Sequence, residues 1–386
     1  MSSAVAKAVV AAGVLVAALS GCKTTTGEVD DLARLENLIR IPSVTSDIDA
    51  VNRAVDFMKS ELEDDGLFCA VETTDEGRKI LFASNDGSKE PDVIFSAHID
   101  VVAAQTPELF EPKRHDGCIW GRGASDCKEH CVLVARLLRE LKGRVSCGCI
   151  FGTNEEGGGK STDEMLVRGY GGKKLVIVLD SEQYAVTTRH KGLQTLVVTA
   201  TEKPAHTAFM TNEPPSAVLR LMRGFEKIAT EVPSFEDGSW RDVVSLSSIT
   251  GTRTKAEMRV RVAYATTEGR DRIERKVRAI KDADVKVLRD SPPVWLDEKD
   301  PVLVDFLERM RRFWPDRNCS FYHLKSSTDA RWMQRLGLPM LILCIDARGG
   351  HTETEHMSIK SFYEYDQLIR EYLLEKYAQP EGKAQP

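Results

Sequence analysis

Each of three short apolar runs in this chain ends in side chains of the kinds that bind divalent metals. In chain order, the runs and the side chains that follow are 93–97 (VIFSA) with His98 and Asp100, 147–154 (CGCIFGTN) with Glu155 and Glu156, and 175–179 (LVIVL) with Asp180. Short continuous apolar runs are typical of central parallel strands covered on both faces. Ligand crevices of open α/β sheets lie at the carboxyl ends of such strands. The pattern predicts a metal site at this edge, because unneutralised acids gathered there would repel one another.

The pair Glu155-Glu156 is the most specific of these features. Adjacent glutamates on a surface loop are usually just solvated, but these two end a predicted buried strand and precede Gly157-Gly158-Gly159. Two unpaired charges in that place would be costly without a metal. One glutamate could bind metal while the other takes a proton from water. Asp180 closes the next strand in the same way, with Glu182 as a weaker substitute.

Three further residues could complete the site. Asp100 lies two positions after His98, so on a strand both side chains point the same way, and Asp100 could orient the imidazole if His98 turns towards it. Asp126 lies in GRGASDCK at the predicted start of a long helix, where it could be a simple N-cap or a carboxylate shared between two cations. His351, in GGHTETEH, follows the last apolar strand and taken alone would be a surface histidine.

The elements that must position these residues alternate between helix and strand, which predicts an α/β fold, a mixed sheet with helices on both faces. Residues 125–142 form a strongly amphipathic predicted helix. Between Gln194 and Asp290 the predicted order is β-α-β-β-α-β, a ferredoxin-like unit. The expected domains are a signal peptide at 1–22, a discontinuous metal-binding catalytic domain at 28–190 and 291–380, and an inserted lid or dimerisation domain at 191–290.

Bulk composition excludes some functions, and the N-terminus suggests a location. The 386 residues carry a net charge of −6 with no long basic run, so nucleic-acid binding is unsupported. The apolar run Ala8–Leu19 is too short to span a bilayer. It leads into Leu19-Ser20-Gly21-Cys22, which resembles a bacterial lipobox, with an ordinary signal peptide as the alternative. We expect lipidation of Cys22, membrane attachment through that anchor alone, and a cell-envelope location. Lys23 in place of Asp favours the outer membrane facing the periplasm.

Six blocks of the sequence, in order, resemble the di-zinc amidohydrolase family of acetylornithine deacetylase, succinyl-diaminopimelate desuccinylase, aminoacylase and carboxypeptidase G. The matching blocks are SAHIDVV, GRGASDCK, TNEEGGG, LVIVLDSE, STDAR and GGHTETEH. They lie within roughly residues 30–375. The resemblance implies a zinc-exopeptidase-like fold around the ferredoxin-like insertion.

The resemblance also implies a role for each residue of the metal site. His98 and Asp180 would hold one metal, Glu156 and His351 the other, and Asp126 would bridge the two. Glu155 would be the general base, and Asp100 the orienting partner of His98. The mixed histidine and carboxylate set favours two zinc ions, although cobalt or manganese also suits such sites.

Substrate contacts follow from the resemblance as well. His206, in PAHTA, matches the insertion-domain histidine that reaches a partner subunit's active site, which implies a homodimer. Arg331, with Ser327 and Thr328 in STDAR, matches a segment associated with the substrate carboxylate, although Arg331 could instead be an ion-paired structural residue.

Several positions depart from the family pattern. Glu129-His130 replace the small residues usual after Asp126-Cys127-Lys128 and could crowd the first helical turn. The loop Thr250–Lys255 lacks the usual Asn-x-Ile-Pro element. The arginine expected late in the next strand has no clear match, because Arg259 and Arg261 fall early and Ala263-Tyr264 occupy its expected place. The substrate-reading surface is therefore expected to be unusual.

The predicted function is a zinc-dependent hydrolase that cleaves the amide bond of a small N-acyl amino acid or short peptide, as a deacylase, carboxypeptidase or dipeptidase. Two alternatives remain open. The altered insertion favours an envelope-anchored binding protein that has lost turnover, although a pure binder would not need Glu155. A di-metal aminopeptidase would be distinguished by its dependence on a free amine.

Overall fold

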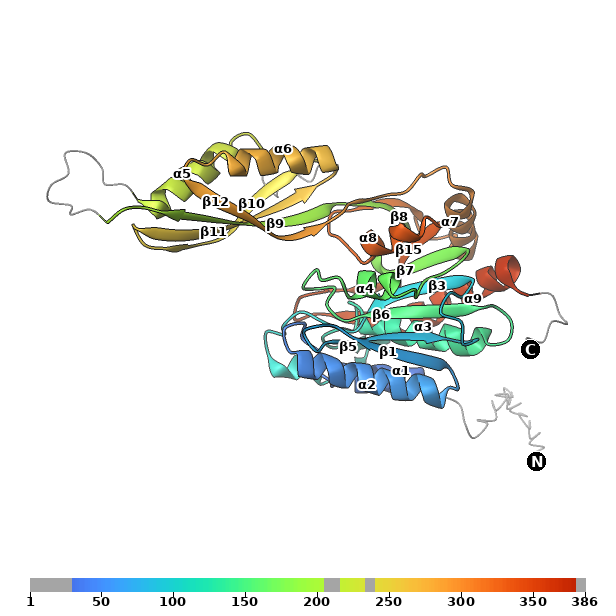
Figure 1. Ribbon diagram of the computed structural model, residues 1–386. Coiled ribbons are helices and arrows are strands. Elements are labelled where there is room, and N and C mark those ends of the chain that lie inside the picture. The colour runs from blue at the N-terminus through green and yellow to red at the C-terminus, as the bar shows by residue number, and fades with distance from the viewer. Residues whose placement is uncertain (1–29, 205–215, 233–239, 380–386) are drawn as a thin grey trace, which may run out of the picture. The chain divides into compact units, whose positions relative to one another are not determined.

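The structure is a computed structural model that describes residues 30–204, 216–232 and 240–379. Its central element is a six-stranded sheet (Figure 1). In spatial order the strands are β1 (Phe68–Thr73), β2 (Lys79–Ser84), β6 (Cys147–Gly152), β3 (Val93–His98), β7 (Leu175–Gln183) and β15 (Met340–Cys344). Strands β6, β3, β7 and β15 run parallel, while β1 and β2 pair antiparallel. The predicted mixed sheet is thereby confirmed.

Helices cover both faces of this sheet, as predicted. Successive residues of a strand point to opposite faces, and in β3 Val93 and Phe95 join one apolar core while Ile94 joins another. The larger core includes α1 (Asp31–Ile39), α2 (Ile48–Asp64), α3 (Lys128–Leu141), α7 (Pro301–Phe313) and α9 (Ile359–Tyr377). The smaller core includes α4 (Ser161–Val167) and α8 (Ala330–Met333). All six residues of β3 are buried, as expected of a strand covered on both sides.

The described residues between 192 and 291 form a second, four-stranded sheet with its own apolar core. Its spatial order is β10 (Val243–Gly251), β11 (Lys255–Tyr264), β9 (Gly192–Thr201) and β12 (Ala283–Ser291), with every pair antiparallel. Helices α5 (Ala217–Ala229) and α6 (Thr267–Arg278) lie together against one face (Figure 1). This is the strand order of a ferredoxin-like unit, while its role as a lid or dimerisation domain stays a prediction.

Two small sheets were not predicted. One consists of β13 (Val294–Trp295), β8 (Ala185–His190) and β14 (Ser320–Leu324). The other consists of β16 (Ala347–Arg348), β17 (His356–Ser358), β5 (Cys118–Trp120) and β4 (Lys113–His115). Pairing of His356 with Trp120 brings the loop after β5 next to the loop before β17. These are the loops that carry Asp126 and His351.

Two remaining features bear on the sequence analysis. The eight cysteines of the described chain are all free thiols. Among residues 30–204, 216–232 and 240–379, no helix combines the length and apolar character needed to cross a bilayer.

Candidate metal centre

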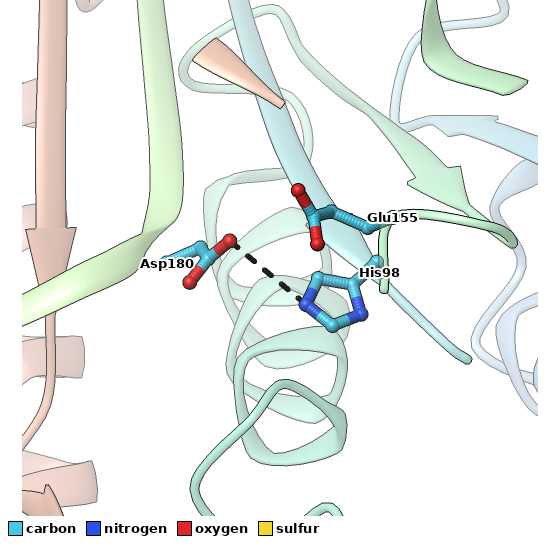
Figure 2. Close-up of side chains that lie close together, drawn as sticks. All are labelled: His98, Glu155 and Asp180. Carbon is cyan, nitrogen blue, oxygen red and sulfur yellow. Dashed lines mark ion pairs between the residues drawn. The ribbon is translucent and has the colours of Figure 1, made fainter. Parts of the chain in front are cut away.

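His98, the last residue of β3, lies at the middle of a cluster of acids. Its Nε2 atom is 3.0 Å from Asp126 Oδ1 and 3.9 Å from Asp180 Oδ2. Figure 2 shows the carboxylates of Glu155 and Asp180 beside the imidazole of His98. One potential ligand atom each from His98, Glu155 and Asp180 lies within 4.8 Å of the others. The three strand ends identified in the sequence therefore do meet at one place.

A second group of potential ligands lies on the other side of Asp126. His351 Nε2 is 3.1 Å from Asp126 Oδ2 and 3.0 Å from Glu156 Oε1, and these three residues form a second mutually close set. Asp126 thus presents one carboxylate oxygen to each histidine. This is the arrangement needed by a carboxylate shared between two cations. The alternative of a helix N-cap is wrong, because Cys127 is the N-cap of α3 and no side-chain hydrogen bond is made there.

Backbone geometry explains how Asp180 and His351 reach the site. Regular pairing of β7 with β15 stops at Leu179 and resumes at Gln183, so Asp180 lies in a bulge inside the strand, and the predicted strand end at residue 179 is corrected. His351 adopts the left-handed region with φ of +65°. Such a conformation is uncommon for residues other than glycine, although asparagine, aspartate and histidine adopt it more often than most. It is found more often at functional sites than elsewhere.

The electrostatics of the cluster show that it is short of positive charge. Burial, together with the neighbouring Asp126, raises the pKa of Asp180 well above its usual range. Burial also raises the pKa of Glu156. Burial opposes ionisation of Asp126 too, but the neighbouring imidazoles of His351 and His98 outweigh it and lower the pKa of Asp126. Hydrogen bonds to Asp126 and Glu156 raise the pKa of His351 to about 10. The raised pKa values mean that Asp180, Glu156 and His351 retain protons more readily than usual, and a bound cation could replace those protons.

The chemistry of His98 fits a metal ligand. Its Nδ1 lies 2.9 Å from the backbone oxygen of Asp100, which accepts the N–H and leaves the lone pair on Nε2. That Nε2 atom is buried, and its approach to Asp126 is not aligned as a hydrogen bond. A histidine whose second nitrogen donates to an oxygen is the usual form of a metal-binding imidazole. The residues present therefore fit divalent metal.

Asp100 is placed differently from the expectation. Its carboxylate Oδ1 is 3.6 Å from His98 Nδ1, farther than the carbonyl oxygen of the same residue. The carboxylate instead accepts hydrogen bonds from Thr45 Oγ1 at 2.7 Å and from the backbone N–H groups of Glu155 and Glu156 at 3.0 and 3.3 Å. Asp100 therefore fixes both the imidazole, through its backbone, and the turn that carries the two glutamates, through its side chain.

Arg331 is an ion-paired residue in this structure. Its side chain is buried, and its Nη1 donates to Glu155 Oε1 at 2.5 Å and to Ser327 Oγ at 3.1 Å. Its Nη2 lies 3.3 Å from Asp329 Oδ1. Thr328 Oγ1 accepts the backbone N–H of Ala330 at 3.2 Å. The structure thus places Arg331 against Glu155, with Ser327 bound to Arg331, whereas Thr328 contacts the backbone of its own segment. Contact of these three residues with a substrate carboxylate stays a prediction.

Glu129 and His130, which depart from the family pattern, lie inside the protein. Both side chains are buried, with His130 Nδ1 2.9 Å from Glu129 Oε1. His130 Nε2 accepts the backbone N–H of Ile345 at 3.2 Å. They lie in the first turn of α3 and contact the end of β15. His206 and Cys22 lie outside the described residues.

A buried ion pair that the sequence analysis missed joins the two loops of the site. Arg122 Nη1 donates to Glu355 Oε2 inside the protein. Glu355 Oε1 accepts the backbone N–H groups of Gly123 at 2.7 Å and Ser125 at 3.1 Å. Gln105 completes the link, because its Oε1 accepts from Arg122 at 3.2 Å and its Nε2 donates to the backbone oxygen of His351 at 3.1 Å. We call Gln105, Arg122 and Glu355 the loop clasp.

Fold and site together define an α/β protein with two adjoining groups of metal-type ligands at the carboxyl ends of its central strands. Residues 94–375 match the sequence description of peptidase family M20/M25/M40. The chain belongs to this family, which confirms the predicted resemblance.

Similar sequences and structures agree with this assignment. Succinyl-diaminopimelate desuccinylase of Caulobacter sp. (strain K31) is 33% identical over 133 residues, 31% of this chain and 32% of the relative. A probable carboxypeptidase of Arthroderma benhamiae is 29% identical over 140 residues, 33% of this chain and 30% of the relative. The matches thus span about a third of these curated relatives.

Similarity of fold extends over nearly the whole chain. The di-peptidase Dug1p of Saccharomyces cerevisiae has a TM-score of 0.69 at 14% identity, with 89% of this chain and 95% of that chain covered. A tripeptidase of Staphylococcus aureus has a TM-score of 0.70 at 16% identity, with 88% and 96% covered. A dinuclear metal binding peptidase of the M20 family from Bacillus subtilis has a TM-score of 0.60 at 13% identity, with 89% and 96% covered.

Proposed function

We propose that this protein is a zinc-dependent hydrolase that cleaves the amide bond of a small N-acyl amino acid or short peptide. The observation that carries the proposal is Asp126, whose two carboxylate oxygens lie 3.0 and 3.1 Å from the Nε2 atoms of His98 and His351. Names of the similar proteins, which include a desuccinylase, a carboxypeptidase and a di-peptidase, support the same class of substrate.

Each residue of the centre has a distinct task in this proposal. His98 and Asp180 would hold one metal, Glu156 and His351 the other, and Asp126 would be shared between them. Bound divalent ions polarise a carbonyl group and acidify water. Glu155 would take the proton of the attacking water and deliver it to the leaving amine.

The surroundings of Glu155 suit a proton carrier. Its Oε1 is held by Arg331, and within the described residues no group donates a hydrogen bond to its Oε2. One oxygen therefore fixes the carboxylate while the other is left for water. The backbone N–H of Glu155 is tied to Asp100 at 3.0 Å, which fixes the turn on which the carboxylate stands.

The test is amine release from a panel of N-acyl amino acids and dipeptides, with metal-stripped and zinc-restored protein compared. We expect turnover only with metal, and a loss of at least about 100-fold in kcat for Glu155→Gln. The matched control is Glu90→Gln, the same change of side chain at an exposed position before β3, which should keep full activity.

Other outcomes are informative. Activity that requires a free α-amine would favour a di-metal aminopeptidase. Two bound metals per chain without turnover on any member of the panel would contradict the hydrolase and favour a binding protein.

Two further proposals concern assembly and location. We infer a homodimer, in which His206 of one subunit serves the site of the other, and an envelope anchor at Cys22. Sedimentation of the purified protein tests the first. Palmitate labelling of wild-type protein against Cys22→Ala tests the second, and recovery of the wild type in the cytosolic fraction would overturn it.

A further inference from the structure

Arg331 pairs with two buried carboxylates, although only one of them belongs to the candidate metal centre. Its Nη1 atom donates to Glu155 Oε1 at 2.5 Å, and its Nη2 atom lies 3.3 Å from Asp329 Oδ1. None of these three residues is more than 8% exposed. Within the described residues, Nε and Nη2 of Arg331 make no aligned hydrogen bond. The position of the guanidinium therefore depends on the two ion pairs and on Ser327, which accepts from Nη1.

The usual role of an aspartate before a helix does not account for Asp329. This residue precedes α8 as the N-cap, but its side chain makes no hydrogen bond to the backbone of that helix. Its Oδ2 atom instead accepts the hydroxyl of Thr162, in the first turn of α4, at 2.5 Å. One oxygen of the carboxylate is thus fixed by α4, while the other lies beside Arg331.

Gly152, the last residue of β6, leaves the room that this carboxylate occupies. A Cβ atom at Gly152 would lie 2.8 Å from Asp329 Oδ2 and 3.0 Å from Thr162 Oγ1. Both distances are shorter than ordinary van der Waals contact, so a larger residue would displace the pair. The end of β6, which leads into Glu155, is therefore shaped to accept Asp329.

The charge of Asp329 is not explained by stability alone. Burial raises the pKa of Asp329 to about 6, while Arg331 and the Thr162 hydroxyl act in the opposite direction. The carboxylate is therefore largely ionised at about pH 7 and above. Replacement of buried ionic groups by apolar ones is often neutral or stabilising, so a second buried anion beside a guanidinium that already has Glu155 needs another reason.

We propose that Asp329 is a positioning residue for the general base, which acts through Arg331 and is itself fixed by Thr162. Asp329 holds the guanidinium, and the guanidinium holds Glu155 Oε1, so that Oε2 remains available to water. A catalytic group must keep its productive geometry to within about 0.5 Å. The three glycines that follow Glu156 supply no side chains for this purpose. The proposal rests on the proposed hydrolase function.

The first test measures kcat and KM of zinc-loaded Asp329→Asn on the best substrate among the N-acyl amino acids and dipeptides. We expect kcat to fall at least about 10-fold and KM to change less than about threefold, because the base loses its orientation while the substrate contacts remain. Asp64→Asn, the same change at an exposed position of α2, should alter neither value.

Two results of this test would overturn the proposal. A rise in KM with unchanged kcat would assign Asp329 and Arg331 to substrate binding. A loss of bound zinc in Asp329→Asn would mean that Asp329 supports the metals rather than the base.

Thr162 offers a milder pair of variants. Thr162→Val removes the hydroxyl that fixes Asp329 and should lower kcat at least about threefold at unchanged KM. Thr162→Ser keeps the hydroxyl and should retain kcat within about twofold of the wild type. Equal kcat values for the two variants would contradict the role of Thr162 and Asp329. If circular dichroism shows that Asp329→Asn does not fold, this pair decides the outcome.

A crystallographic measurement is independent of activity. In the zinc-loaded wild type, Glu155 Oε1 should lie in contact with Arg331. In Asp329→Asn the separation should exceed about 3.5 Å, the limit of a hydrogen bond, while His98 and Asp180 keep their places. An unchanged contact in the variant, or its absence from the wild type, would overturn the role of Asp329. If no substrate is cleaved but the carboxylate moves as expected, the hydrolase fails and the positioning role stands.

Discussion

Asp126 is the residue on which the two ligand groups depend, because its side chain approaches both histidines. Its oxygens lie 3.0 Å from His98 Nε2 and 3.1 Å from His351 Nε2. Removal of this carboxylate would leave two incomplete groups of ligands rather than one intact group.

Asp126→Asn is therefore expected to lower bound zinc from two ions per chain to one or none. The amide keeps the size of the side chain, but it offers one neutral oxygen ligand in place of two oxygens that share a negative charge. Metal analysis after dialysis against limiting zinc measures the effect. Asp64→Asn, at the exposed end of α2, is the control and should retain both ions. Retention of two tightly held ions by Asp126→Asn would show that Asp126 is not shared.

At this scale the sequence predicted the candidate metal ligands. It did not predict the residues that hold those ligands in position. His98, Glu155 and Glu156 were predicted because they follow apolar runs, which can be recognised from the sequence alone. Glu355 stands among other polar residues, and nothing in its neighbourhood shows that it is buried against Arg122. Its place four residues after His351 was the one available indication.

At the scale of elements, the loop clasp joins the segment between β5 and α3 to the segment between β16 and β17. Glu355 binds two backbone N–H groups of the first segment, and Gln105 binds the backbone of His351 in the second. The pair Arg122–Glu355 should therefore couple the position of Asp126 to that of His351. Burial raises the pKa of Glu355 to about 7, against the influence of Arg122.

A double-mutant cycle with Arg122→Met and Glu355→Gln measures the energetic coupling between these two side chains, on which the link between the two loops depends. Removal of one partner leaves the other buried without compensation, so each single variant should lose on the order of 3 kcal/mol. The double variant should lose less than the sum, by about 1–3 kcal/mol. Urea unfolding of metal-stripped protein gives the free energies. Strict additivity would mean that the two side chains act independently.

Short elements explain most of what the sequence analysis missed in the fold. Strands β16 and β13 have two residues each, too few for an alternating pattern to appear. The bulge at residues 180–182 was also invisible, because the apolar run ends at Leu179 whether or not the strand continues. In contrast, the ferredoxin-like order was predictable, since its strands and helices span nine residues or more.

At the scale of the whole molecule, pH should alter stability through a buried histidine that is not one of the metal ligands. His190, on β8, is fully buried, and burial lowers its pKa to about 3. An unfolded chain binds a proton at this residue below about pH 6.5, whereas the folded chain does not. The unfolded state therefore gains protons first, and stability falls as the pH drops from about 6.5 towards 3.

Between about pH 6.5 and pH 4.5 this single group should remove about 2 kcal/mol of unfolding free energy. His190→Phe abolishes the titration, so its stability should fall less steeply than that of the wild type over this interval. Urea unfolding at several pH values, with metal-stripped protein, gives both slopes. His115→Gln alters an exposed histidine and should keep the wild-type slope. Parallel slopes for wild type and His190→Phe would contradict the prediction.

The bridging position of Asp126 also has a consequence for the order in which the protein is made. His98 lies 28 residues before Asp126, whereas His351 lies 225 residues after it, beyond the whole β9–β12 sheet. The residues of the first ligand group, His98, Glu155 and Asp180, leave the ribosome long before His351, which the second group needs. During synthesis the nascent chain can therefore assemble at most half of the centre, and full metal loading requires a polypeptide that has been made at least as far as His351.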